Sequence, residues 1–310
     1  MPIVVAGNVF VDIKGFPDSK YIPAGRNSGW VEFVHGGVGR NVVEDIANVE
    51  LRPRFVSMVD DTAQGEDVIR KLRHHKVDTR FVAQVPDGMG IWLAIHDGEG
   101  DIASSISKRP NMEAMVELLE QRGDEIFADA DSVVVEIDMD KEVIKQVFRF
   151  ARKYNKRIYA LVANMSIATQ RRDFLQSVDC FVCNVQEAGI LFAAEFEDLT
   201  PEEMSRELFE RISSAQIPAM VVTMGSRGAV FASLDGQCGV CPAQTVHVRD
   251  TAGAGDAFFA GVAIGLTYGK DLMSSCEIGS RLASSVITLS ENTCPRFLPE
   301  ELGLDVAVED

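Results

Sequence analysis

Short apolar runs rich in β-branched residues alternate with amphipathic stretches along most of this 310-residue chain. The amphipathic stretches space their apolar residues as one face of a helix does, and the apolar runs have the length of buried strands. This alternation favours a parallel sheet with helices on both faces. The expected strands are residues 3–6, 132–137, 157–162, 180–183, 220–223 and 229–232, and the expected helices are 141–154, 171–178, 186–194 and 201–215.

Two segments break this rhythm. Residues 30–34 alternate apolar and polar side chains, and residues 90–106 form two strand-like runs around Asp97-Gly98-Glu99-Gly100, which is typical of a hairpin turn. We therefore expect one domain, 1–310, with a small β-sheet inserted from about 13–35 and 86–108. Such a sheet can cover a pocket as a lid, and a plain edge hairpin is the alternative.

The charge balance limits the partners. Thirty Lys and Arg residues against 47 Asp and Glu give a net charge of −17, which disfavours nucleic acid or an anionic membrane as the main partner. An anionic substrate would need a local cluster of amide donors, cations or metal. No apolar run reaches the roughly 18 residues of a membrane span, and the N-terminus has no basic leader, so a cytoplasmic location is expected.

The cysteines include two Cys-x-x-Cys pairs, Cys180/Cys183 and Cys238/Cys241. Cys180 and Cys183 lie in an apolar run that is typical of a buried strand. Because residues three apart in a strand point to opposite faces, these thiols are poorly placed to share a metal. Reduced thiols in the core are the better interpretation than a zinc site.

Small residues precede an apolar, helix-competent run at residues 257–266. Gly253, Ala254 and Gly255 allow backbone N–H groups at a helix start to approach an anion closely. Asp256 follows in the first turn, where the helix dipole favours its ionised form. A carboxylate beside an anion hole suits phosphoryl transfer to an alcohol. A glycine-rich turn with a capping aspartate is the alternative.

Two further segments suit an alcohol-bearing acceptor. Gly36 and Gly37 precede Asn41 at the start of a helical run, where backbone and amide groups can bind sugar hydroxyls. Asp12 follows the first expected strand, and ligands of open α/β sheets bind at the carboxyl ends of the strands. A tight strand-to-helix turn and a surface aspartate are the respective alternatives.

Residues near two other strand ends suit a nucleotide. Thr223, Gly225 and Gly228 form a turn of donors after an apolar strand. Asn184 and Glu187 follow another strand, where Glu187 can hold Mg²⁺ through water. An ordinary loop and a helix-start glutamate are the alternatives. The sequence contains no Gly-x-x-x-x-Gly-Lys-Ser/Thr, which excludes a P-loop enzyme.

These segments, in this order and spacing, resemble the ribokinase-like (pfkB) family of carbohydrate kinases over essentially the whole chain. Asp250-Thr-Ala-Gly-Ala-Gly-Asp-Ala-Phe258 is similar to the C-terminal signature of that family, and the segment ending in Asn41 is similar to its N-terminal signature. The resemblance implies a three-layer α/β/α sandwich, a mostly parallel sheet and a small β-sheet lid that commonly mediates homodimers. It also implies ATP as phosphoryl donor and Mg²⁺ as cofactor.

The resemblance assigns a role to each candidate residue. Asp256 would be the catalytic base. The anion hole would consist of Gly253, Ala254 and Gly255, and the acceptor hydroxyls would be held by Asp12, Gly37 and Asn41. The nucleotide would be bound by Asn184, Thr223, Gly225 and Gly228, Mg²⁺ by Glu187, and a monovalent cation such as K⁺ by Asp250.

The acceptor stays open at this point. Gly-Gly-Val-Gly-Arg-Asn is most similar to pseudouridine kinases, which favours transfer to the 5′-hydroxyl of pseudouridine. Trp30, Phe33 and Trp92 can offer aromatic surface to a base, or they can simply pack the small sheet. A simple sugar such as ribose, fructose or a sugar acid is the alternative acceptor, and a non-catalytic sugar-binding regulator is a further one. A Rossmann-type oxidoreductase is disfavoured because the dinucleotide glycine fingerprint is missing.

Overall fold

The large sheet is mostly parallel, as the alternation of strands and helices predicts. Residues 2–97, 99 and 101–306 are described by a computed structural model, and within them nine strands form this sheet in the order β13-β12-β11-β10-β9-β8-β1-β4-β5. Only β12 and β13 run antiparallel to their neighbours. The strands are β1 Ile3–Ala6, β4 Arg54–Val59, β5 Asp78–Gln84, β8 Ser132–Glu136, β9 Arg157–Leu161, β10 Cys180–Asn184, β11 Ala219–Thr223, β12 Ala229–Ser233 and β13 Cys238–Cys241.

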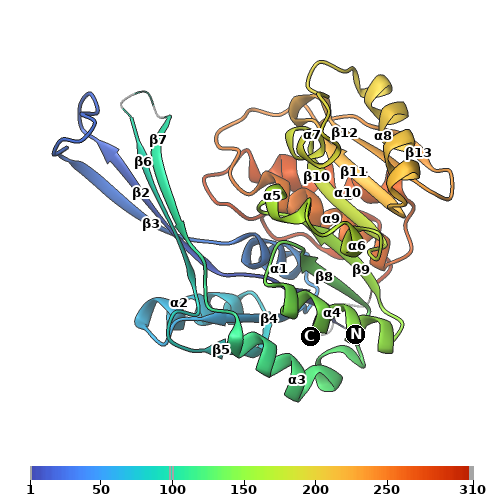
Figure 1. Cartoon of the computed structure of the whole chain (residues 1–310), viewed down its shortest axis with the longest axis horizontal. Helices are drawn as coiled ribbons and strands as arrows, with labels where there is room; N and C mark the ends of the chain where they lie inside the picture. The colour runs from blue at the N-terminus through green and yellow to red at the C-terminus, as the bar shows by residue number, and fades with distance from the viewer. Residues whose placement is uncertain (1, 98, 100, 307–310) are drawn as a thin grey trace.

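Helices cover both faces of this sheet and divide the core into two clusters of buried side chains. One face is covered by α1 Val38–Asn48, α2 Ala63–His74, α9 Ala254–Thr267 and α10 Leu272–Val286. The other carries α3 Glu113–Phe127, α4 Lys141–Lys153, α5 Met165–Ala168, α6 Arg172–Leu175, α7 Val185–Phe192 and α8 Pro201–Ala215. The predicted three-layer α/β/α sandwich is confirmed (Figure 1).

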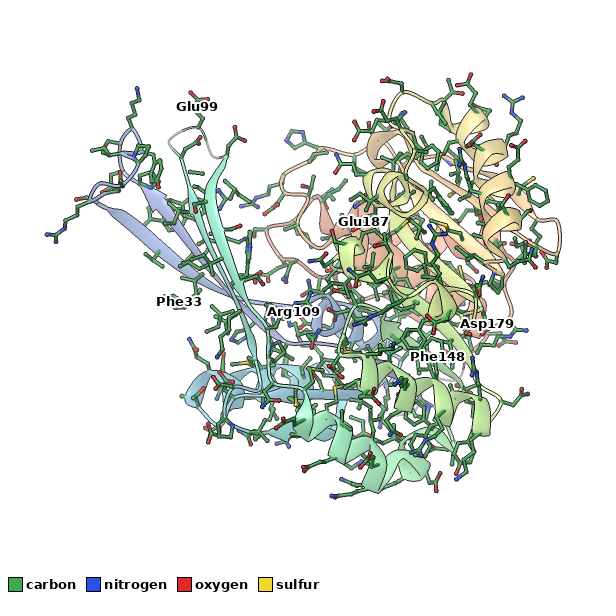
Figure 2. The ribbon with its side chains drawn as sticks, in the orientation of Figure 1. Phe33, Glu99, Arg109, Phe148, Asp179 and Glu187 are labelled. Atoms are coloured by element: carbon green, nitrogen blue, oxygen red, sulfur yellow. The ribbon has the colours of Figure 1, made fainter. Side chains whose placement is uncertain are left out.

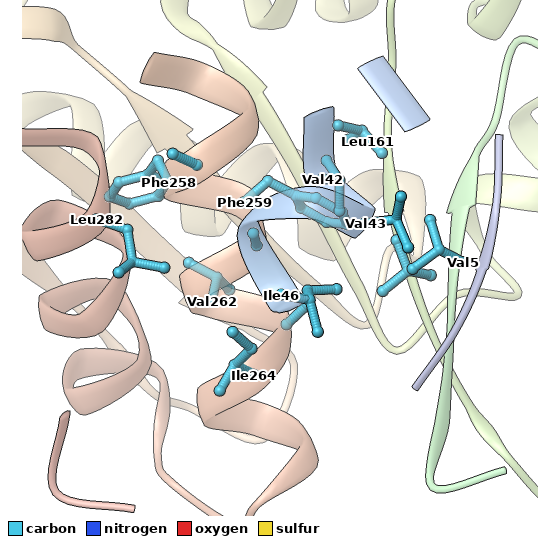
Figure 3. Close-up of a cluster of buried hydrophobic side chains, with 14 of the residues drawn as sticks. Val5, Val42, Val43, Ile46, Leu161, Phe258, Phe259, Val262, Ile264 and Leu282 are labelled. Atoms are coloured by element: carbon cyan, nitrogen blue, oxygen red, sulfur yellow. The ribbon is translucent and has the colours of Figure 1, made fainter. Parts of the chain in front are cut away.

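Helix α9 is buried between its neighbours, which fixes the residues at its start. Phe259 and Val262 pack with Ile46 of α1 and Leu282 of α10 in one continuous apolar cluster (Figure 3). Nearly every side chain from Ala257 to Gly265 is buried. A helix held on several sides gives its first turn a defined position, as a catalytic group requires.

A separate small sheet stands at one side of the large one (Figure 1). Its order is β3-β2-β6-β7. Its strands are β2 Phe10–Pro17, β3 Gly29–Gly36, β6 Gly90–His96 and β7 Ile102–Lys108. The predicted turn between β6 and β7 includes Gly98 and Gly100, which lie outside the described residues.

Some elements differ from the sequence prediction. β4, β5 and β13 were not predicted, and β5 and β13 are the two edges of the large sheet, where polar side chains interrupt the apolar pattern. Helix α6 ends at Leu175 rather than 178, because the chain turns there and Ser177 bonds back to Asp173 and Phe174. No helix among the described residues is long and apolar enough to cross a membrane.

The cysteine pair in β10 lies across the sheet. Cys180 belongs to the core cluster on one face and Cys183 to the cluster on the other. Burial raises the pKa of both thiols above the usual range. In β13, Cys238 is exposed while Cys241 is buried. Neither pair presents two thiols to one side of a strand.

Candidate active site

A cavity of about 850 Å³ opens where the strand order reverses. The chain leaves β1 for β4 and β5 on one side, and returns through β8 to the other side. Asn8 follows β1 and Glu136 ends β8, and both line this cavity. Open α/β sheets bind ligands at such switch points because adjacent loops there diverge.

Asp256 lies on the cavity wall in the first turn of α9. The turn requires Gly253, which caps the helix with φ of 79°. A Cβ atom at this position would lie 2.0 Å from the carbonyl oxygen of Asn292, so no larger residue fits. The predicted glycine-rich start of a helix therefore brings the Asp256 carboxylate and the first free N–H groups of α9 together.

Asn41 holds the Asp256 carboxylate. Its Nδ2 donates a hydrogen bond of 2.8 Å to Asp256 Oδ2. Burial raises the pKa of Asp256 to about 6, and the charge of Glu187 adds to this rise, whereas the Asn41 hydrogen bond and the charge of Arg40 lower the pKa. Asp256 is thus ionised at neutral pH and is a stronger base than an ordinary aspartate.

The other predicted acceptor residues line the same cavity. Asp12 reaches it from β2, and burial raises the pKa of that carboxyl. Gly37 caps α1 with φ of 98°, and a Cβ atom there would lie 2.6 Å from the carbonyl oxygen of Asn8. The structure therefore brings Asp12, Gly37, Asn41 and Asp256 into one site.

The sequence reasoning missed Asn8 and Glu136. The backbone N–H and Nδ2 of Asn8 each donate a 3.0 Å hydrogen bond to the Glu136 carboxylate. Burial, together with the nearby Asp138, raises the pKa of Glu136. Glu136 ends β8, one residue before the end of the expected strand 132–137, so a carboxylate near a strand end was the signal that could have found it.

The rest of the cavity wall combines apolar side chains with charged groups. Trp92, Met112 and Ile167 line it together with two guanidinium groups, those of Arg109 and Arg171. Arg109 lies on the side of the small sheet that faces the large body (Figure 2) and 3.7 Å from the Asp138 carboxylate, which also lines the cavity. Arg171 donates to the carbonyl oxygens of residues 137 and 139. The cavity thus offers apolar surface and N–H donors in addition to the polar groups around Asp256.

Only one of the three predicted aromatic side chains reaches the cavity. Trp92 pairs with Asp12 across the strands, so both point to the same face of the small sheet. Trp30 shares that face but stacks on Phe16 farther out, with ring centroids 4.2 Å apart. Phe33 lies on the opposite face, because side chains alternate along a strand (Figure 2). The expectation that Phe33 faces the acceptor is therefore wrong.

The residues predicted for the nucleotide lie on neighbouring strand ends outside this cavity. Asn184 ends β10 and pairs with Thr223, which ends β11. Asn184 and Glu187 form a capping box at the start of α7, with both hydrogen bonds at 2.8 Å. Gly225 and Gly228 have φ of 59° and 90° in the following turn. None of these residues is among the described residues that line the cavity.

The two predicted ion ligands belong to different segments: Glu187 lies in α7 and Asp250 in the loop before α9. Burial raises the pKa of Glu187, whose charge in turn acts on Asp256. Asp250 is exposed and accepts a hydrogen bond from the N–H of Ala252. No group of three or more His, Cys, Asp or Glu side chains in the described part of the chain is placed to hold a metal. A single carboxylate suits a Mg²⁺ ion that keeps most of its water and binds phosphate oxygens.

The sequence matches the model of a known protein family. This model, of pfkB family carbohydrate kinases, matches residues 2–295. The chain belongs to the pfkB family. As a member of that family it is an ATP-dependent phosphotransferase that uses an alcohol group as acceptor, and more specifically a sugar or nucleoside kinase.

Relatives of this pfkB protein include kinases of nucleosides and of sugars. A guanosine-inosine kinase of Exiguobacterium acetylicum is 31% identical over 295 residues, covering 94% of this chain and 95% of that protein. A pseudouridine kinase of Escherichia coli is 22% identical and covers 94% and 92%. The structure of an Arabidopsis thaliana ribokinase complexed with ribose and ATP has a TM-score of 0.83 at 20% identity, covering 99% of both chains.

Proposed function

We propose that this kinase phosphorylates the 5′-hydroxyl of a ribonucleoside whose base carries a carbonyl oxygen, guanosine or inosine first and pseudouridine second. The observation that carries the proposal is the composition of one cavity. Its polar groups around Asp256 suit a ribose, and its wall also holds Trp92 and two guanidinium groups that suit a base. A volume of about 850 Å³ is in the upper part of the usual range for small-molecule sites, about 300–1,000 Å³.

The chemistry of Trp92 and the two guanidinium groups favours some bases over others. Arginine N–H groups pair well with the O6 and N7 acceptors of guanine, and hypoxanthine presents the same two atoms. Adenine places an amino donor at that edge, which would oppose the donors of Arg109. The uracil ring of pseudouridine also carries carbonyl oxygens. The sequence alone favoured pseudouridine, whereas the higher identity to a guanosine-inosine kinase favours the purine nucleosides.

The proposed mechanism uses the site as follows. Asp12 and Asn41 bind ribose hydroxyls, and Asp256 accepts the proton of the 5′-hydroxyl as that oxygen attacks the γ-phosphorus of ATP. The bond from the γ-phosphorus to the β–γ bridging oxygen breaks, and ADP leaves. The N–H groups at the start of α9, from Gly253 to Gly255, stabilise charge on the transferred phosphoryl group. Mg²⁺, held near Glu187, would neutralise charge on the phosphates. A K⁺ site at Asp250 and a cytoplasmic location stay predictions of the sequence.

Steady-state kinetics test the acceptor. We expect kcat/KM for guanosine and inosine to exceed that for ribose and fructose by roughly tenfold or more, about 1.4 kcal/mol of extra transition-state binding. Adenosine should rank below both. Arg109→Met should lower kcat/KM for inosine about tenfold and leave adenosine nearly unchanged. Arg211→Met, on the distant helix α8, is the matched control.

The ranking of acceptors separates the alternatives. If pseudouridine exceeds the purine nucleosides, the second candidate is the better one. If a simple sugar is the best acceptor, the nucleoside assignment is wrong and the kinase assignment stands.

The outer face of the small sheet suggests a homodimer, which we also propose. Val31, Phe33 and Ile106 are 59%, 61% and 69% exposed, and Leu93 and Ile95 share this face. An apolar patch of this kind on a sheet marks an interaction surface. Phe33→Glu should convert a dimer to a monomer in sedimentation velocity, whereas Ser105→Glu, on the other face of the sheet, should not. A wild-type protein that is monomeric at tens of micromolar would contradict the proposal.

A further inference from the structure

Arg40 is the bulkiest of the nearly fully buried side chains, with 1% of its surface exposed. It lies in the first turn of α1, next to Asn41. Its Nη1 donates to Asn41 Oδ1 at 2.8 Å, to Asn292 Oδ1 at 3.2 Å and to the carbonyl oxygen of His35 at 3.3 Å. Its Nη2 lies 2.6 Å from Glu44 Oε2. One guanidinium thus joins the end of β3, the start of α1 and the C-terminal loop.

These contacts fix the orientation of the Asn41 amide. Asn41 Oδ1 receives two donors, Arg40 Nη1 and, at 3.2 Å, Asn292 Nδ2. The Nδ2 group of Asn41 must then point the other way, where it donates to Asp256. A flipped amide would place its oxygen against the Asp256 carboxylate and its NH₂ against the guanidinium, and both contacts would be repulsive.

Glu44 compensates the charge of Arg40 without using Asp256. Glu44 is also 1% exposed, and its Oε1 accepts a 3.0 Å hydrogen bond from Thr293 Oγ1. Lys71 and His75 lie 3.5 and 3.7 Å from the same oxygen. A buried guanidinium with this set of partners is expensive to rearrange, so it holds one geometry.

We infer that Arg40 and Asn292 are positioning residues for catalysis: they lock the Asn41 amide in the one orientation that donates to Asp256. The inference rests on the proposed role of Asp256 as the base. Neither residue needs to touch the substrate, because each acts through the amide of Asn41. The expected signature is therefore a change in pH dependence and a loss of turnover at saturating acceptor, which a weaker binding of ribose by Asn41 alone would not produce.

The pH dependence follows from the groups that face Asp256. Asn41 and Arg40 come from α1, Asp12 from β2, Glu136 from β8 and Glu187 from α7. The carboxylates raise the pKa of Asp256, whereas Arg40 and Asn41 lower it. Removing Arg40 and releasing Asn41 should raise this pKa. Since the base must be ionised, the acid limb of the kcat profile should then move to higher pH.

The test uses a double variant, because Arg40→Met alone would leave Glu44 charged and buried. In Arg40→Met/Glu44→Gln we expect kcat at saturating acceptor to fall about tenfold or more, and acceptor KM to rise as well, because Asn41 also binds the ribose. The acid limb should move up by roughly half a pH unit or more. Asn292→Ala removes one of the two donors to Asn41 Oδ1. It should lower kcat and move the acid limb to higher pH, each by less than the double variant does. Arg40→Lys should recover only part of the loss, because one ammonium group lacks the planar fork.

Arg54→Met is the matched control. Arg54 is a buried guanidinium that pairs with Asp78 and Asp129 at the far side of the sheet. This variant should lower the melting temperature and leave the acid limb in place. If the double variant behaves like Arg54→Met, with normal kcat and pH profile, the inference is wrong. If Asp256→Asn keeps near-normal turnover, the role of Asp256 as base fails instead, so the two failures are distinguishable.

Discussion

The acceptor end and the nucleotide end of this site are built in different ways. Around the acceptor, side chains provide the polar groups: Asp12, Asn41 and Asp256 point into a cavity whose walls are already packed. At the proposed nucleotide end, backbone N–H groups would provide them, in turns with positive φ at Gly225, Gly228 and Gly253. A side chain can be exchanged with little effect on the backbone. A glycine with positive φ cannot be exchanged so freely, since a Cβ atom strains the turn itself.

This contrast separates the effects of substitutions. Changes at the acceptor end should alter kinetics while the fold stays intact. Changes at the nucleotide end should alter kinetics and stability together, unless the glycine has room for a methyl group. The predictions below test this separation.

The largest effect on turnover is expected from removal of the divalent metal ion that we propose at the nucleotide end. Without a divalent ion, turnover should fall to background, because no P-loop lysine is available to neutralise the phosphates. Glu187→Gln should raise the free Mg²⁺ concentration needed for half-maximal rate about tenfold, or roughly 1.4 kcal/mol. Glutamine can keep the capping box, so the melting temperature should change little.

A second capping box gives the control for this variant. Glu203 occupies the same position at the start of α8, where it bonds to Thr200. Glu203→Gln should leave the Mg²⁺ dependence unchanged. Equal Mg²⁺ dependence in both variants would show that Glu187 is only a helix cap.

The next effect in size concerns the base at the acceptor end. Asp256→Asn should lower kcat by roughly 10²–10⁴-fold with little change in ATP affinity. Asp45→Asn is the matched control: Asp45 is buried on the same helix as Asn41 but accepts its hydrogen bond from the N–H of Cys294, and burial raises its pKa. This variant should keep its turnover. Near-normal turnover of Asp256→Asn would remove Asp256 from the mechanism.

The Asp256→Asn variant should not lose stability. The folded-state pKa of Asp256, about 6, lies above its unfolded value, so the ionised form is disfavoured in the fold. Stability from this group is complete below the unfolded pKa and is lost as pH rises through about 6. At pH 8 we therefore expect Asp256→Asn to raise the free energy of unfolding, by up to about 3 kcal/mol. Such a gain would identify Asp256 as a functional rather than a structural residue.

Local sequence patterns predicted most strands of the large sheet and, among the residues that line the cavity, Asp12, Asn41 and Asp256. Strands with continuous apolar runs, such as β1 and β10, were predicted, whereas the edge strands β5 and β13 and the inner strand β4, which Ser57 interrupts, were not. Asn41 and Asp256 were found because each lies beside a glycine-rich turn. Asp12 was expected to close the first strand, but it lies within β2 of the small sheet. The structure brings these three together in the cavity, as the sequence reasoning expected.

Other parts of the site depend on contacts between distant segments. Asn8 and Glu136 are 128 positions apart, and only the pairing of β1 with β8 brings them together. Arg40 belongs to the glycine-rich segment, but its role became apparent only from its hydrogen bond to Asn292, which is 252 positions away. The face on which Phe33 lies depends on the strand register, which the alternation of 30–34 does not fix. Such features come from topology, and no local pattern encodes them.

The smallest effect is expected at the glycine-rich turn that starts α9, where substitutions of two glycines can be compared. Gly253→Ala should lower both activity and melting temperature, because its Cβ would lie 2.0 Å from the Asn292 carbonyl oxygen and φ is 79°. A Cβ at Gly255 meets no atom within 4 Å, and alanine favours a helix more than glycine by about 1 kcal/mol. Gly255→Ala should therefore fold at least as well as wild type.

The kinetics of Gly255→Ala then decide the role of the turn. If the N–H groups of 253–255 approach the transferred phosphoryl group, an added methyl group should lower kcat/KM for ATP about tenfold even though the fold is intact. Gly269→Ala, at the other end of α9 with φ of 80° and open space, controls for backbone strain alone. It should cost about 1 kcal/mol of stability and no activity. Unchanged ATP kinetics in Gly255→Ala would mean that this turn only starts the helix, and that the phosphate-binding donors lie elsewhere, with the turn of Gly225 and Gly228 as the next segment to test.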